Sequence, residues 1–277
     1  MIELWNKAKV IYRIEGVLVL FKKSLRFVLE EIVGLFHQFG LVSYIKSDKL
    51  PTVIEVSADD INWKSTFSKH QFPTTDGNVK KYDVPYDQPI VGILSGPWDL
   101  FKTKWENSQH HQSLKNHFEA EVPWEETELY RRNIAKIEGG MAGQSGVETA
   151  DELKQRCLEI DKLYQSMNTH GYVPQSKLTK NKSSTASLNT KRICGTSVPD
   201  ECRIGIGRTG ELIRFSGGRH RLSIAKLLDL NDIPVVVVVR HKRWQTIREA
   251  FQNATSIEDL PETYLKYSNH PDIQEFV

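Results

Sequence analysis

Residues 215–221 have the sequence Phe-Ser-Gly-Gly-Arg-His-Arg, which predicts a tight turn between a strand and a helix. Before this turn, residues 203–206 and 211–215 are predicted to form two short strands joined by a glycine-bounded turn. After it, apolar residues recur at helical spacing over 222–230, and the uninterrupted apolar stretch 233–239 predicts a further strand. The C-terminal half therefore contains a unit with the order strand, strand, helix, strand.

The glycine turn is suited to holding an anion. Gly217 and Gly218 would let the backbone approach a phosphate closely, and the first N–H groups of the following helix have no partner within the helix. Arg219, His220 and Arg221 add donors that carry charge at the same place. The alternative is a simple turn followed by a solvated basic helix start. Basic side chains in a first helical turn oppose the helix dipole, so an anion explains them better.

Residues 215–221 resemble the glycine-rich turn and basic helix start of the ParB/sulfiredoxin-like superfamily, where nucleotide phosphates bind. Residues 161–175, Asp-Lys-Leu-Tyr-Gln-Ser-Met-Asn-Thr-His-Gly-Tyr-Val-Pro-Gln, resemble the first helix of that family, its terminal glycine and the proline-containing segment before the first strand. The resemblance covers about residues 153–241. Sulfiredoxin has a cysteine where this chain has Arg219, so its sulfur chemistry is not implied. The resemblance implies that ATP or another nucleotide, with Mg²⁺, is bound by Ser216, Gly217, Gly218, Arg219, His220 and Arg221.

Phosphoryl transfer at such a site also needs a carboxylate that holds the metal or accepts a proton from the acceptor hydroxyl. The candidates are Glu125 and Glu126 in a Trp-Glu-Glu-Thr turn that is expected to open a helix at Pro123, Asp161 in the family-like helix, and also Asp99. Each has a plain structural alternative, as a helix-start charge, a helix cap or a solvated residue. Glu125 is preferred because aromatic neighbours would desolvate it.

These residues predict a nucleotide-binding protein, and specifically an ATP-dependent phosphotransferase acting on a small hydroxylated acceptor. The alternative is a non-catalytic nucleotide- or nucleic-acid-binding regulatory module of the ParB type. The segment after residue 241 has no helix-turn-helix pattern of adequate length, which favours the enzyme. The lack of an assured catalytic carboxylate favours the regulatory module.

The composition of the chain limits its possible partners and location. The chain has 277 residues, 39% of them hydrophobic, and a formal net charge of +2, so it can bury a sizeable core. Nearly balanced charge disfavours a dedicated nucleic-acid binder, although nucleic acid is kept as a partner of second choice. Three cysteines without CxxC spacing predict a reducing, cytoplasmic location.

Two further patterns do not indicate a site. His110, His111 and His117 lie near one another in sequence, but they complete no zinc pattern and are expected on a solvated helical face. The glycine-rich stretch 139–146 lacks the Gly-Lys-Ser/Thr ending of a P-loop, so it is predicted to be a linker.

We therefore expect an α+β protein with a ParB/sulfiredoxin-like C-terminal core and a helical, aromatic-rich N-terminal region. An apolar stripe over residues 21–36 predicts a helix docked on the protein's own core, with peripheral membrane contact as the alternative. The region 92–132 is expected to be helical, a further helix is expected from about residue 149 to residue 167, and 179–192 is expected to be a flexible insertion. The predicted divisions are an amphipathic segment at 1–47, an accessory region at 48–147, the nucleotide-binding core at 148–242 and a helical tail at 243–277.

Overall fold

The structure is a computed structural model, and it describes residues 17, 44–45, 50–66, 91–178, 190–193 and 196–277. It contains helices and one large mixed sheet, so the α+β class is confirmed. The amphipathic helix expected at 21–36 and most of the insertion expected at 179–192 lie outside the described residues. Within the described part, no helix is both long enough and apolar enough to cross a membrane.

The main sheet has eight strands in the order β1-β4-β10-β8-β9-β3-β5, with β2 also paired to β10. Its strands are β1 (Tyr44–Ile45), β2 (Thr52–Val56), β3 (Trp63–Ser65), β4 (Gly92–Leu94), β5 (Lys102–Lys104), β8 (Cys202–Ile206), β9 (Leu212–Ser216) and β10 (Ile233–His241). β10 is parallel to β4 and β8, whereas β8 and β9 are antiparallel. A separate hairpin consists of β6 (Thr190–Ile193) and β7 (Thr196–Pro199).

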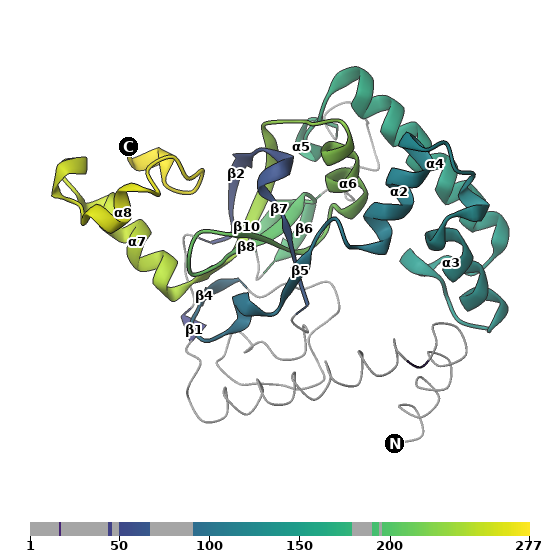
Figure 1. The fold of residues 1–277 in the computed structure, drawn as a ribbon, viewed down its shortest axis with the longest axis horizontal. Coiled ribbons are helices and arrows are strands. Elements are labelled where there is room, and N and C mark those ends of the chain that lie inside the picture. Colours follow the sequence, from purple (N-terminus) through teal and green to yellow (C-terminus); the bar gives the residue numbers. More distant parts are fainter. Residues whose placement is uncertain (1–16, 18–43, 46–49, 67–90, 179–189, 194–195) are drawn as a thin grey trace.

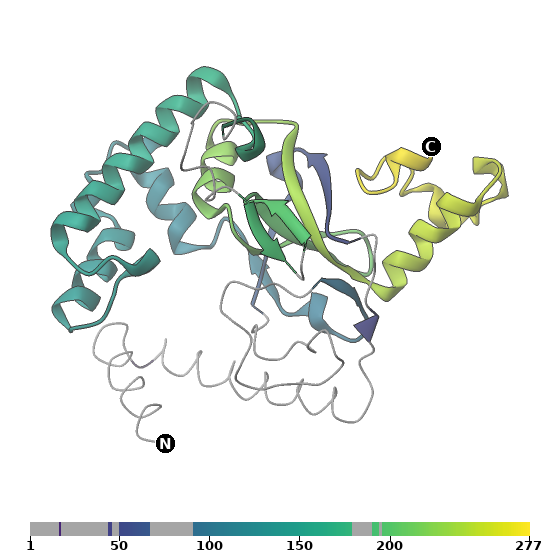
Figure 2. The same ribbon diagram turned by 180° about the vertical axis from the view of Figure 1, so that it is seen from behind.

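The helices lie at two ends of this sheet (Figures 1 and 2). They are α2 (Gln109–Glu119), α3 (Glu128–Glu138), α4 (Ala150–His170), α5 (Gln175–Leu178), α6 (Arg219–Leu227), α7 (Lys242–Asn253) and α8 (Glu262–Leu265). Short 3-10 helices are η1 (Ala58–Asp60), η3 (Trp98–Leu100), η4 (Trp124–Glu126), η5 (Gln144–Gly146), η8 (Ile257–Asp259) and η9 (Gln274–Phe276). In both views α6 lies between the sheet and the layer formed by α2, α3 and α4, while α7 and α8 lie at the opposite end.

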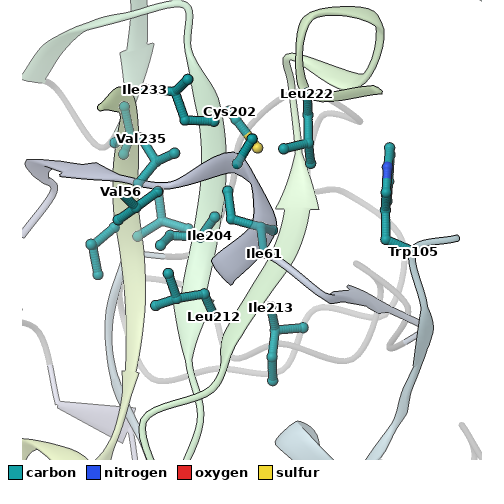
Figure 3. Packing of buried hydrophobic residues seen from close by; sticks show 14 of the residues in the cluster. Val56, Ile61, Trp105, Cys202, Ile204, Leu212, Ile213, Leu222, Ile233 and Val235 are labelled. Carbon is teal, nitrogen blue, oxygen red and sulfur yellow. The ribbon is translucent and has the colours of Figure 1, made fainter. Parts of the chain in front are cut away.

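The core is built around β10, whose sequence Ile-Pro-Val-Val-Val-Val-Val-Arg-His is buried throughout. β10 pairs with β8 along one edge and with β2 and β4 along the other, so no part of the strand needs a polar outer face. Figure 3 shows Val235 of β10, Ile204 of β8 and Ile213 of β9 in this core, with Leu222 of α6 packed beside them. Burial of these side chains fixes α6 on the sheet.

The expected strand, strand, helix, strand unit is confirmed as β8, β9, α6 and β10. α4 is confirmed as well, and it begins after Thr149 in a capping box with Glu152. Such elements are marked by local signals, namely caps, glycines and apolar periodicity.

Three details of the prediction are wrong. The region 92–132 is not wholly helical, because β4 and β5 are strands of the main sheet. The helix expected to open at Pro123 instead begins at Glu128, after a 3-10 turn and a cap from the Thr127 side chain. Residues 190–192, expected at the end of the insertion, belong to β6 (Thr190–Ile193). β4 and β5 have three residues each, too few for a visible alternation, and their pairing with distant strands decides their conformation.

Strands from both sides of the predicted boundary at 147/148 pair in one sheet. β2 and β4 precede that boundary and pair with β10, and β3 precedes it and pairs with β9. The strands of the accessory region and those of the core are therefore parts of one sheet.

Candidate anion-binding site

The turn between β9 and α6 can be formed only by small residues. Gly217 and Gly218 have left-handed backbone conformations, with φ angles of 67° and 50°. A Cβ atom on Gly217 would lie 2.7 Å from the carbonyl oxygen of Glu201, and one on Gly218 would lie 2.9 Å from the backbone of Cys202. Both contacts are too close for a side chain, so the turn is packed directly on the start of β8.

The first turn of α6 is open to an acceptor. Side chains of Ser108, Thr127, Thr149 and His241 cap α2, α3, α4 and α7, respectively. α6 begins after Gly218 and receives no such cap from the described residues. Its leading N–H groups also lack acceptors within the helix, and the helix dipole places partial positive charge there. The turn is half-buried and in reach of solvent, so an anion could supply the missing acceptor.

Arg221 does not lie at an exposed helix start, which corrects the expectation from the sequence. Its guanidinium donates to Oε2 of Glu201 at 2.7 Å and to the carbonyl oxygen of Val173. It also lies over the ring of Tyr172, 3.9 Å from the ring centre. Arg221 is buried because it packs against Tyr172, Val173 and Glu201, which lie outside the strands of the sheet. Of the predicted donors, Arg219 and His220 remain half-buried beside the turn, and Ser216 ends β9 before it.

His110 of α2 joins the site, although the sequence placed it on a solvated face. His110 is 8% exposed and His111 is 7% exposed, so the expectation of a solvated face is wrong for both. The ring of His110 meets the ring of His220 edge-on, with centroids 4.5 Å apart. Neither ring nitrogen of His110, nor Nδ1 of His220, has a hydrogen-bond partner among the described residues. The first turns of α2 and α6 therefore meet at a pair of unsatisfied imidazoles.

The charged groups that act on this pair are cations. Burial, followed by nearby His220, Arg219 and Arg214, lowers the pKa of His110 well below its usual range. Burial, followed by Arg219, Arg156 and Arg214, lowers the pKa of His220 to about 3. Both rings are therefore neutral near pH 7, and each keeps an N–H group that can donate.

Arg214 is held in place beside the glycine turn. Its guanidinium donates to the carbonyl oxygen of Gly217 from Nη2 at 2.6 Å and from Nε at 3.1 Å. It lies 5.0 Å from the ring centre of Trp105, whose indole N–H has no acceptor among the described residues. The site thus combines a fixed buried cation with several donors.

The predicted carboxylates lie in the helical layer. Glu125 and Glu126 are exposed in η4. Asp161 of α4 accepts hydrogen bonds from the indole of Trp124 at 2.9 Å and from Nε2 of His117 at 3.1 Å. These contacts bring Asp161 to η4, but they do not bring it to the glycine turn. The catalytic role of the three carboxylates stays a prediction.

Asp99 is a structural residue. It is 1% exposed, and its carboxylate binds Arg208 in a bidentate manner at 2.7 and 2.8 Å. Burial opposes the charge, but the hydrogen bonds from Arg208 outweigh it and lower the pKa of Asp99. Within the residues that the structure describes, no three His, Cys, Asp or Glu side chains are grouped so that they could hold a metal ion.

Comparisons of the chain with protein-family models, with curated proteins and with solved structures found no match. The site is therefore interpreted from its own geometry.

Proposed function

We propose that this chain is a nucleotide-binding protein of the ParB/sulfiredoxin-like type, which transfers a phosphoryl group from the nucleotide to a small hydroxylated acceptor. The observation that carries the binding step is the uncapped start of α6, which follows a close-packed glycine turn and is surrounded by cations. A nucleotide phosphate offers hydrogen-bond acceptors and negative charge to this cationic helix start.

In the proposed reaction, the acceptor hydroxyl oxygen forms a bond to the terminal phosphorus while the bond to the leaving diphosphate breaks. Mg²⁺ bound to the phosphates would neutralise part of their charge. The first-turn N–H groups of α6 and the side chain of Arg219 would hold the transferred group in place. The hydroxyl proton would pass to a carboxylate, for which Glu125 is the predicted residue.

The binding step is tested by the variant Arg219→Ala. We expect it to weaken binding of ATP at least about tenfold, because a charge-assisted hydrogen bond is worth about 1.5–3 kcal/mol. A thermal-shift screen of ATP, ADP, CTP and GTP, with and without Mg²⁺, would select the nucleotide, and titration calorimetry would give the affinities. Arg243→Ala, which alters an exposed arginine of α7, is the matched control. Equal affinities in both variants would contradict the assignment.

A second candidate function is a non-catalytic nucleotide switch. It is favoured by one observation, namely that the contacts of Asp161 and the exposed positions of Glu125 and Glu126 do not join these carboxylates to the turn. A nucleotide switch needs the phosphate site but no catalytic base. Both candidate functions therefore require that a nucleotide binds at the start of α6.

The variant Glu125→Gln separates the two functions. If Glu125 acts as the base, turnover should fall about a hundredfold while nucleotide affinity changes little, because the base acts mainly in the transition state. Glu138→Gln, at the exposed end of α3, is the control. If Glu125 serves only the start of a helix, the variant should show a small decrease in melting temperature and unchanged turnover. That result would remove Glu125 from the mechanism.

A further inference from the structure

We propose that His110 completes the anion site from the α2 side, and that the His110–His220 pair takes up a proton when a phosphate or sulfate dianion binds. This inference rests on the proposed function only for the location of the ligand. It adds a binding residue from the helical layer, and it predicts how affinity depends on pH.

Among the described residues, the fold gives the His110 ring no hydrogen-bond partner. Its side chain is more than nine-tenths buried, and both ring nitrogens lack a hydrogen-bond partner among the described residues. A buried polar group in that state destabilises a fold, and a phenylalanine of similar shape would not carry this penalty. Contact with His220 directs the ring to the first turn of α6, which has no side-chain cap from the described residues.

The charge around the two histidines also favours an anion. The groups that act on His110 are His220 and Arg219 of α6, Arg214 of β9 and His111 of its own helix. Those that act on His220 are Arg219, Arg156 of α4 and Arg214. None of these neighbours in the described part of the chain is a carboxylate. A ligand that satisfies both imidazoles must therefore accept hydrogen bonds, and a negative charge on it would balance the cations.

Binding of a dianion beside the two histidines is linked to proton uptake. Without ligand, burial and neighbouring cations keep both rings neutral. A dianion beside the pair favours the protonated ring, so it raises the pKa of one histidine, and solvent supplies the proton. Linkage then requires the dianion to bind more tightly as the pH falls, by up to about tenfold per pH unit for one proton.

Sulfate is the best probe of this linkage, because it stays a dianion throughout the working range whereas phosphate itself titrates near pH 6–7. Binding of sulfate to the full chain would be measured by thermal shift between about pH 7 and pH 4.5 at constant ionic strength, because the pKa of His220 is about 3 without ligand and the linkage acts between that pKa and the raised one. Binding of ATP would be measured by calorimetry in two buffers with different ionisation enthalpies, which reports proton uptake directly. We expect sulfate affinity to rise at least about threefold per pH unit towards acid.

The variants are His110→Phe, which keeps the buried aromatic contact, and His170→Gln, an exposed control at the end of α4. His110→Phe should bind sulfate at least about fivefold more weakly and with a flatter pH dependence, while His170→Gln should match the wild type. If His110→Phe does not fold, His110→Gln and His220→Asn test the same loss of proton uptake.

The outcomes separate this inference from the proposed function. Binding of ATP without proton uptake, and with equal affinity in His110→Phe, would overturn the inference while nucleotide binding stands. Proton-coupled binding of sulfate and pyrophosphate without binding of ATP would support the inference and contradict the proposed function. Weak anion binding that sodium chloride abolishes equally in all variants would overturn the inference.

Discussion

Replacement of Asp272 by alanine is expected to lower the free energy of unfolding by about 3–5 kcal/mol, because it leaves a buried arginine without its counter-charge. The side chains of Asp272 and Arg240 are each 1% exposed, and Arg240 lies on the central strand β10. The carboxylate accepts from Nε and Nη2 of Arg240 at 2.9 and 2.5 Å, and from the indole of Trp244 at 2.8 Å. Nε of Arg248 is 3.5 Å from the same carboxylate.

Urea unfolding followed by circular dichroism would measure this loss. Glu262→Ala, which alters an exposed acidic residue of α8, should change the free energy of unfolding by no more than about 0.5 kcal/mol. A loss below about 1 kcal/mol for Asp272→Ala would mean that water reaches Arg240 after the substitution. Asp272 lies among the last residues of the chain. His270 also helps to hold this segment on the sheet, because it contacts the carbonyl oxygen of Gly210 at 2.8 Å.

The sequence predicted the parts of the fold that short segments determine. The glycine turn and the apolar run of β10 are local signals, and both were located correctly. Pairings between distant segments were missed. His110 meets His220 only because α2 packs against α6, and no sequence pattern links the two positions. Arg221 looked like a solvated donor because its burial depends on contacts with Glu201 and Val173, which no sequence pattern shows.

The candidate site was therefore predicted in part. Its backbone, the turn and the start of α6, follows from glycine positions and helix physics. Which side chains line the site depends on tertiary packing. Packing buries Arg221, and it brings His110 to the site. The assignment of Glu125, Glu126 and Asp161 to the same site needs a contact between distant segments, and sequence spacing cannot supply one.

Loss of Glu201 is expected to have a similarly large effect, about 3–5 kcal/mol for Glu201→Ala, because three groups depend on this buried carboxylate. Glu201 is 1% exposed and accepts from Arg221 at 2.7 Å, from the hydroxyl of Tyr172 at 2.7 Å and from the backbone N–H of Gln175 at 2.6 Å. Its own carbonyl oxygen lies beneath Gly217, so the same residue supports the glycine turn.

The double variant Glu201→Gln with Arg221→Met tests whether the pair is structural or binds the ligand. Removing both charges together leaves no uncompensated ion, and glutamine keeps an acceptor for Tyr172, so most of the stability lost in Glu201→Ala should return. If Arg221 only anchors α6, the double variant should bind the nucleotide within about threefold of wild type, because the turn and Arg219 are unchanged. If Arg221 contacts phosphate, as the resemblance implied, a well-folded double variant should lose at least about tenfold in affinity. We expect the first result, since the guanidinium of Arg221 is already bonded to Glu201 and Val173 and stacked on Tyr172.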